Sequence, residues 1–441
     1  MDWHQLLSPY RTGQKNIAST DQSRSAFEQD YDRIIFSQPF RRLQDKTQVH
    51  PLPEHDFVHT RLTHSLEVSS VGRSLGKHAG EVIVQRHVSL KNEFTLFDIG
   101  AIVAAASLAH DLGNPPFGHA GEDAISDFFV SHPQGEFFKD KVTGEEWTDL
   151  IKFEGNAQGF RILNKNQYGL KLTFATLGAF TKYPCPSYFP NRDLSRRSQK
   201  KFGFFQSEKE VFKEVAQQLA LNKVSDYASG RHPLAFLVEA ADDICYSIID
   251  LEDGCNLGLV SYELAKSLFE GVITKGRSKL GKLEQLNNQQ EKIGYLRALA
   301  IGDLMDECSS QFLDHEEAIL GGKFDQALAD NCPSKQGLKE IINISVEKIY
   351  RARQVVEIEA AGHEVLPGLL EGFTKAGFYL LNNTRSRKYQ NLQQLFPTDI
   401  RMAIQSKPIV YNMLRQVLDF VSGLTDRHAL SLYRKINGIS I

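Results

Sequence analysis

The spacing of apolar residues along the chain is the feature that most limits its fold. Apolar side chains recur every three or four residues in long segments, whereas sustained alternation with a period of two is rare. Such spacing puts them on one face of a helix, which can then pack into a core. The main segments are residues 26–36, 61–85, 97–110, 121–130, 157–163, 233–251, 262–274 and 291–307. The sequence predicts an all-α fold, with short strands possible at 171–176 and 201–205.

Two segments lack the helical spacing. Residues 131–149 are rich in glycine and charged side chains, and residues 184–210 include a basic run. The run comprises Arg192, Arg196, Arg197, Lys200 and Lys201. We expect solvated loops in both segments. The basic run could contact single-stranded nucleic acid or a neighbouring subunit.

Composition limits the class of protein. The chain has 441 residues and a formal charge of -3, so its length leaves the domain count open and its total charge favours no nucleic-acid binder. The longest apolar run, 99–109, is shorter than the roughly 18 residues of a membrane helix. The N-terminus lacks the basic and apolar stretches of a secretory signal. Five scattered cysteines form no CxxC pair. We expect a cytoplasmic protein that does not interact with membranes.

A histidine and an aspartate directly follow an apolar helical segment. His110 and Asp111 come after residues 98–109, and the turn at Pro115 and Pro116 must end that helix. Polar groups at the buried end of a helix are costly unless they are paired or bind something. The dipeptide alone is common, so other residues must support a site here.

A second histidine belongs to the apolar face of another helix. His64, Val68, Val71 and Leu75 follow one another at steps of four, three and four residues. His64 therefore faces the core, where it is either a hydrogen-bonded core residue or a ligand.

Two carboxylates lie on one face of a third helix. Asp242, Tyr246 and Asp250 are spaced four residues apart. A buried cation would explain acidic groups on an otherwise apolar face, although spacing alone does not choose between Asp242 and Asp243. Two imidazoles and two carboxylates would neutralise one divalent ion and leave positions open for water and phosphate oxygen. Nitrogen and oxygen ligands without thiolate suit manganese, iron, cobalt, nickel, magnesium or zinc.

One long motif extends from the His-Asp pair. It reads His110-Asp-Leu-Gly-Asn-Pro-Pro-Phe-Gly-His119-Ala-Gly-Glu122. It resembles the signature of the dGTP triphosphohydrolase family, the branch of the HD superfamily that hydrolyses deoxynucleoside triphosphates (dNTPs). Further blocks resemble the same family in the same order, at 39–49, 60–68, 153–161, 182–184, 242–250 and 422–427. The whole chain is therefore expected to form one catalytic unit.

The resemblance implies roles for individual residues. Its metal ligands are His64, His110, Asp111 and Asp242. Its catalytic residues are His119 and Glu122, which lie one helical turn apart, so that Glu122 can orient His119 as a general acid or base. The alternative for residues 119–122 is helix capping.

The resemblance also implies substrate contacts. Gln48 and Asp250 are assigned to the deoxyribose, and Tyr183 and Tyr246 to the sugar and phosphates. The phosphates are assigned to Arg61 and Lys182, whose alternative is that they are ordinary surface cations.

The resemblance further implies a domain organisation and partners. We expect an HD-domain helical core at 60–255, with a loop-rich insertion around 131–210. A helical region at 256–441 would complete the site and the interface of a homo-oligomer, a hexamer by resemblance. A dNTP at an allosteric site is possible in this family.

The expected reaction is attack of a water, activated by the metal, on the α-phosphorus of a dNTP, which releases deoxynucleoside and tripolyphosphate. Other HD enzymes, such as phosphodiesterases and alarmone hydrolases, could share the metal ligands. A nucleotide-sensing or nucleic-acid-binding protein whose active site is silent is the alternative from another class.

Overall fold

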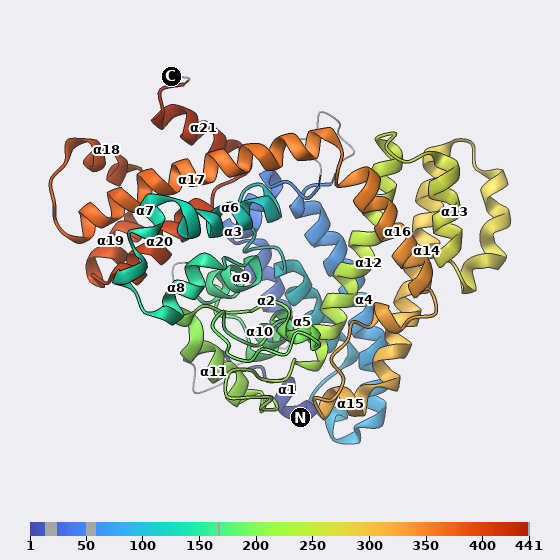
Figure 1. The fold of residues 1–441 in the computed structure, drawn as a ribbon. Coiled ribbons are helices and arrows are strands. Elements are labelled where there is room, and N and C mark those ends of the chain that lie inside the picture. Colours follow the sequence, from blue (N-terminus) through green and yellow to red (C-terminus); the bar gives the residue numbers. More distant parts are fainter. Residues whose placement is uncertain (14–23, 50–58, 166–167, 440–441) are drawn as a thin grey trace.

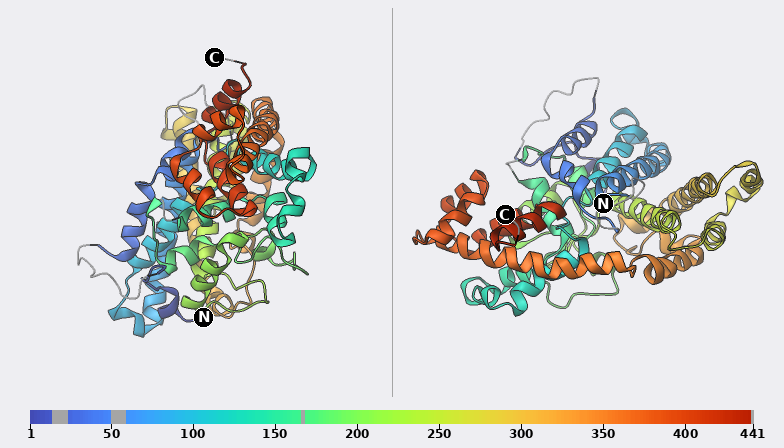
Figure 2. Two further views of the ribbon diagram at one scale, coloured as in Figure 1. Left: turned by 90° about the vertical axis from the view of Figure 1, so that its left-hand side faces the viewer. Right: turned by 90° about the horizontal axis from the view of Figure 1, so that it is seen from above.

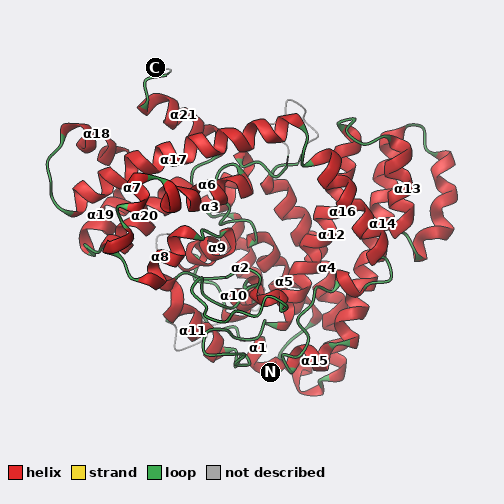
Figure 3. Cartoon of the chain, viewed as in Figure 1, coloured by secondary structure: helices red, strands yellow, loops and turns green. Residues whose placement is uncertain are grey.

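Helices form the whole regular structure of the described residues (Figure 1). The computed structural model describes residues 1–13, 24–49, 59–165 and 168–439. The first helices are α1 (Trp3–Leu6), α2 (Ala26–Ile35), α3 (Gln38–Arg42), α4 (Arg61–Arg86), α5 (Leu96–Ala109), α6 (Gly118–Ser131), α7 (Pro133–Glu136), α8 (Gly144–Ile151), α9 (Gly155–Asn164), α10 (Phe174–Phe180) and α11 (Lys209–Gln218). Within these ranges no strand is present, which confirms the all-α prediction (Figure 3).

The second half of the chain is also helical. Its helices are α12 (Pro233–Asn256), α13 (Tyr262–Val272), α14 (Gln289–Asp314), α15 (Glu316–Leu320), α16 (Lys335–Ile344), α17 (Arg353–Leu381), α18 (Arg387–Leu395), α19 (Thr398–Ser406), α20 (Val410–Ser422) and α21 (Asp426–Ile436). A π-helical turn, η9 (Ser345–Ile349), lies just before α17. Among the described residues, no helix combines the length and hydropathy needed to cross a membrane.

Helices α4 and α5 pack unusually closely because glycines lie between them. An ideal Cβ at Gly76 would lie 3.0 Å from both the Gly100 Cα and the Ile99 carbonyl oxygen. Gly72 and Gly80 likewise leave no room for a side chain against α5. This close approach fixes the position of His64, on α4, relative to the end of α5.

Two apolar clusters form the core. The larger cluster includes side chains of α2, α4, α5, α10, α12 and α14, and the smaller one includes side chains of α6, α8, α17 and α20. The long helix α17 runs across the molecule and packs on α6, with α18 and α19 at one end of the molecule and α13 at the other (Figures 1 and 2).

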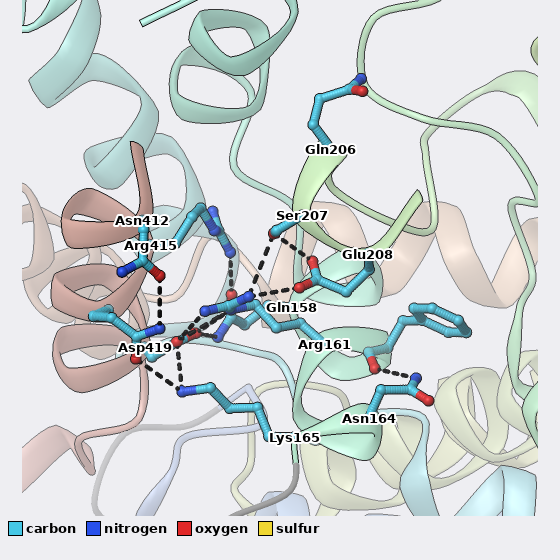
Figure 4. A network of polar contacts seen from close by, with 12 residues as sticks. Gln158, Arg161, Asn164, Lys165, Gln206, Ser207, Glu208, Asn412, Arg415 and Asp419 are labelled. Carbon is cyan, nitrogen blue, oxygen red and sulfur yellow. Dashed lines mark hydrogen bonds and ion pairs between the residues drawn. The ribbon is translucent and has the colours of Figure 1, made fainter. Parts of the chain in front are cut away.

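A buried polar network also joins α9, in the first half of the chain, to α20 near its end. Asp419 on α20 accepts hydrogen bonds from Arg161 and Gln158 of α9, and Lys165 forms an ion pair with it at 2.6 Å (Figure 4). On its other side, the Arg161 guanidinium donates to Glu208. Segments more than 250 residues apart in sequence are thereby tied together through charged groups.

Residues 131–149, for which we expected a loop, contain short helices instead. They form α7, the 3-10 turn η3 (Lys139–Lys141) and most of α8. The caps explain the error: His132 caps α7, and Thr143 and Glu146 form a capping box at α8. Phe138, Asp149 and Leu150 are fully buried, so these short helices pack with one face against the core.

Residues 184–210 are irregular apart from the short 3-10 turns η5 (Arg197–Gln199) and η6 (Gln206–Glu208) and the first residues of α11. Much of the segment is nevertheless buried, including Ser198, Phe202 and Phe205, so it is not a solvated loop throughout. The two possible strands reduce to single bridges at Thr173 and Phe204.

Candidate active site

Three helices bring four polar side chains together at one point in the core. His64 lies in the first turn of α4, His110 caps the end of α5 with Asp111 next to it, and Asp242 lies on α12. The Asp242 Oδ1 lies 3.3 Å from the His64 Nε2 and 3.5 Å from the His110 Nε2. Ligand atoms of His64, His110 and Asp111 all lie within 4.8 Å of one another. This donor set of two imidazoles and two carboxylates fits a divalent cation.

Hydrogen bonding and charge prepare these groups for a cation. The His110 Nδ1 lies 2.7 Å from the Ser107 carbonyl oxygen, to which it can donate a proton, leaving Nε2 with a lone pair towards the cluster. Burial works to raise the pKa of Asp111, but Arg61 and the two histidines hold it well below its usual range. The same balance of burial against His110 and His64 lowers the pKa of Asp242 to about 2. Both carboxylates are therefore ionised at neutral pH.

The structure distinguishes the two adjacent aspartates. Asp242 faces the histidines, whereas the Asp243 carboxylate lies 3.5 Å from the Arg197 guanidinium. Burial raises the pKa of Asp243 to about 7. Of this pair, Asp242 is the one whose carboxylate lies beside the two imidazoles.

The cluster lies in the wall of a cavity of about 480 Å³. Of the residues that the sequence singled out, those lining it are Gln48, Arg61, His64, His110, Asp111, His119, Glu122, Lys182, Tyr183, Asp242 and Tyr246. Asp250 does not line it. Its carboxylate accepts a 2.7 Å hydrogen bond from the Tyr350 hydroxyl, and Tyr350 lines the cavity in its place.

His119 and Glu122 form a pair at the start of α6. The His119 Nδ1 lies 2.8 Å from the Glu122 Oε2, and the other Glu122 oxygen accepts from the Gly155 backbone amide. The His119 side chain is 77% exposed, whereas that of Glu122 is 8% exposed. The hydrogen bond to Glu122 raises the pKa of His119. An exposed imidazole oriented by a buried carboxylate can exchange protons with a bound molecule.

Arg61 is a buried part of the cavity wall and Lys182 a partly buried part of it, so neither is an ordinary surface cation. Arg61 is 5% exposed and donates from Nη1 to the Asp111 Oδ2 at 2.7 Å. The Lys182 Nζ lies 3.4 Å from the Glu239 Oε1. Burial opposes the charge on Lys182, but Glu239 and neighbouring acidic groups raise its pKa above the usual range. Both side chains present positive charge to the cavity.

Gln48 and Tyr246 line the same cavity from segments far apart in the sequence. The Gln48 Oε1 is buried without a hydrogen-bond partner among the described residues. The Tyr246 ring stacks on Tyr350, with centroids 5.5 Å apart. Burial raises the pKa of Asp250, behind Tyr350, to about 8.

Several lining residues were missed from the sequence. Tyr350 and Glu359 come from the segment around the start of α17, and Asn114, Glu154 and Lys201 come from loops or helix caps. Lys201 belongs to the basic run assigned to a solvated loop, yet its Nζ lies 3.1 Å from the Glu154 carboxylate. The block at 153–161 signalled residues 154 and 156. No signal marked Tyr350 or Glu359, because their place depends on where α17 packs.

Comparisons with known proteins agree with this geometry. The HD domain family model matches residues 61–153, and the phosphohydrolase-associated domain model matches residues 333–435. A deoxyguanosinetriphosphate triphosphohydrolase-like protein of Synechocystis sp. is 42% identical, with all of both chains covered. The chain belongs to this family.

Other relatives support the same assignment to the deoxyguanosinetriphosphate triphosphohydrolase-like family. A protein of this name from Pseudomonas aeruginosa is 38% identical over 100% of this chain and 99% of its own. A deoxyguanosinetriphosphate triphosphohydrolase of Salmonella paratyphi A is 31% identical over 100% of this chain and 98% of its own. As a member of this HD family, the chain is a phosphohydrolase.

Proposed function

We propose that the protein hydrolyses deoxynucleoside triphosphates to deoxynucleoside and tripolyphosphate, with one divalent cation as cofactor. The observation that carries this proposal is the convergence of His64, His110, Asp111 and Asp242 in the wall of one cavity. His119 and several cationic side chains line the same cavity. The printed names of the relatives, which specify a triphosphohydrolase of a deoxynucleotide, support the same substrate class.

The four converging residues would hold the cation. Manganese, magnesium, cobalt, iron, nickel and zinc all suit nitrogen and oxygen ligands without thiolate. When bound, such an ion supplies Lewis acidity at the α-phosphate and makes water a better nucleophile. The protein side chains keep the ligands deprotonated, since Arg61 and the histidines stabilise the charge of Asp111.

His119 would manage the proton during hydrolysis. Its Nδ1 is bound to Glu122, so Nε2 is the atom that can give a proton to, or take one from, a substrate in the cavity. The buried Glu122 fixes the ring orientation and favours the protonated form.

Cationic side chains would bind the triphosphate. Arg61, Lys182 and Lys201 line the cavity and can stabilise negative charge on phosphate oxygens. Gln48 offers an unpaired amide oxygen to a sugar hydroxyl. Tyr183 and Tyr246 line the cavity where they could contact the sugar and phosphates and leave no room for a 2′-hydroxyl. Asp250 would act on the sugar through the Tyr350 hydroxyl or after that side chain moves.

The region 256–441 would complete the site and form contacts between subunits. Tyr350, Val355 and Glu359 line the cavity, and nearby Ile342, Val346 and Val356 are exposed apolar side chains. We propose a homo-oligomer, with a hexamer and an allosteric dNTP as extensions of the family resemblance. A cytoplasmic location follows the same resemblance. Contact of single-stranded nucleic acid with the basic run at 192–201 is a further proposal, for which Tyr188 and Phe189 offer neighbouring aromatic rings.

The products identify the bond that is broken. Each dNTP and its ribose counterpart, alone and in pairs, is incubated with the protein and Mn²⁺, and the digest is separated by chromatography. We expect deoxynucleoside and tripolyphosphate from dNTPs and little turnover of ribonucleotides. Release of dNMP with pyrophosphate would reject the reaction, and turnover of an alarmone or a cyclic dinucleotide instead of dNTPs would favour another HD activity.

A variant of His119 separates an enzyme from a silent nucleotide sensor. We expect His119→Ala to lower kcat by about 10²–10⁴-fold, the usual contribution of a general acid or base. Its affinity for Mn²⁺, measured by calorimetry, should not change because the metal ligands are intact. The control is His78→Ala, which replaces an exposed histidine of α4 outside the cavity. Equal activity of the two variants would contradict the role of His119.

A further inference from the structure

We propose that Asp426 is a positioning residue that holds two opposite walls of the catalytic cavity in register. It lies at the first residue of α21 and is 2% exposed. Both carboxylate oxygens are used, and each one bonds a different wall. The inference rests on the proposed triphosphohydrolase activity, because its main readouts are kinetic.

One oxygen holds the segment that carries Gln48. The Asp426 Oδ2 accepts hydrogen bonds from the Thr47 backbone amide at 2.9 Å and from the Thr47 hydroxyl at 2.5 Å. Thr47 itself lines the cavity, and the next side chain, Gln48, has a buried amide oxygen without a partner. No helix contains Thr47, so these bonds, together with its single bridge to Thr60, hold the backbone from which Gln48 extends.

The other oxygen holds the loop that leads to His119. The Asp426 Oδ1 accepts a 3.1 Å hydrogen bond from the backbone amide of Phe117. Phe117 has a φ of 67°, a left-handed conformation that is unfavourable for a residue with a side chain. Because α6 begins at Gly118, this unusual backbone sets where His119 and Glu122 stand. A bond to the Phe117 amide therefore stabilises a conformation on which the catalytic pair depends.

Neighbouring contacts join the same segments. The buried Lys46 Nζ donates to the Ser422 carbonyl oxygen at 2.9 Å and also to the Asn114 carbonyl oxygen. Helix α17 presses on the Phe117 side chain at Gly362, where a Cβ would lie 3.1 Å from the Phe117 Cβ. The C-terminal segment thus contacts both walls, and Asp426 is the side chain of its described part that bonds both of them.

The test compares Asp426 with an aspartate that makes the same kind of bonds elsewhere. Asp303 on α14 is 7% exposed, and its Oδ2 accepts from the Thr274 and Gly276 backbone amides at 2.7 and 2.9 Å, away from the cavity. Substitution of either aspartate should lower the Tm. A purely structural role of Asp426 would therefore give the same result as the control.

We expect Asp426→Ala to lower kcat by about a hundredfold, the order of loss that follows a misplacement of about 1 Å at a site, and to raise KM for the dNTP. Asp426→Asn keeps the shape of the side chain but has one acceptor oxygen, so its kcat should fall less and its KM should rise less than in Asp426→Ala. If Asp426→Ala does not fold, Asp426→Asn carries the test. The inflection that His119 should give in the pH profile of kcat is expected to stay at the wild-type pH, because its hydrogen bond to Glu122 lies within α6.

The controls separate the possible failures. Asp303→Ala and Asp303→Asn should lower the Tm while keeping the wild-type kcat and KM. An active wild type whose folded Asp426→Asn variant keeps the wild-type kcat and KM would overturn the positioning role. A wild type that does not hydrolyse dNTPs would instead refute the proposed function.

Discussion

The His119 imidazole and the Glu122 carboxylate form the residue-scale feature that should control how activity depends on pH. The carboxylate stabilises the imidazolium, mainly through their hydrogen bond, and so raises the pKa of His119 above its ordinary value of 6.5. Removing the negative charge removes that stabilisation, so the pKa must fall.

We therefore expect Glu122→Gln to move the inflection of the kcat profile that belongs to His119 to lower pH. The direction is the same whether His119 acts as an acid or a base, because the inflection follows its pKa. The profile is measured between pH 5 and 9 with saturating dNTP. Asp127→Asn, an exposed position on α6, is the control and should leave the inflection in place. A shift to higher pH in Glu122→Gln would contradict the assignment.

Individual residues also show how far sequence patterns reach. Spacing placed Asp242, Tyr246 and Asp250 on one face of α12, but it could not choose between Asp242 and Asp243. The family resemblance implied Asp242, and the structure gives a physical reason, because Arg197 from a distant segment pairs with Asp243. Similarly, Asp250 lies behind Tyr350, a residue 100 positions away that no local pattern could bring to the site.

At the scale of elements, the close packing of α4 against α5 determines where the proposed metal ligands meet. His64 extends from α4 and His110 ends α5, so the distance between these helices sets the distance between the imidazoles. A Cβ at Gly76 would lie 3.0 Å from backbone atoms of α5, and backbone cannot move aside as a flexible side chain can.

We expect Gly76→Ala to lower the free energy of unfolding by about 1–3 kcal/mol, as overpacking of a core usually does. It should also weaken binding of Mn²⁺, because separating the helices moves the imidazoles apart. Urea denaturation and calorimetric titration measure the two effects. Gly302→Ala is the matched control, since Gly302 lies inside α14 with open space around it. There the helix propensity of alanine should stabilise the protein by about 0.5–1 kcal/mol.

The elements also show why a sequence rich in glycine and charge misled the prediction for 131–149. Residues such as Thr143, Gly144 and Glu146 are typical both of loops and of the capped ends of short amphipathic helices. The structure distinguishes them by burial, since Leu150 and Asp149 face the core. Capping boxes are readable in a sequence, but their effect depends on a surface against which the helix can pack.

For the whole molecule, the network around Asp419 is a buried polar link between α20 and the segment of α9 and Lys165 (Figure 4). Arg161 is 7% exposed and depends on Asp419 and Glu208 for compensation of its charge. Burial works to raise the pKa of Asp419, but Arg161 and Lys165 outweigh this effect and hold the pKa well below its usual range, so Asp419 is ionised at neutral pH.

We expect Asp419→Ala to lower the free energy of unfolding by about 3–5 kcal/mol, because it removes the ion pair of Lys165 and leaves the buried Arg161 with Glu208 as its remaining counter-charge. Chemical denaturation followed by circular dichroism measures this change. Asp226→Ala is the control, because its ion pair with Lys223 is exposed to solvent and should contribute little to stability. An equal decrease in the free energy of unfolding of the two variants would show that the network around Asp419 does not stabilise the packing of α9 against α20.

The sequence by itself determined the all-α class, most of the long helices and the family, because helical spacing and the motif from His110 to Glu122 are local properties of the chain. It also identified residues that the structure brings to one cavity, such as His64 and Asp242. Only the tertiary structure decided which aspartate faces the histidines, that Tyr350 covers Asp250, and that Asp426 bonds two walls at once. These facts depend on contacts between segments far apart in sequence, and the packing of α17, α20 and α21 sets those contacts.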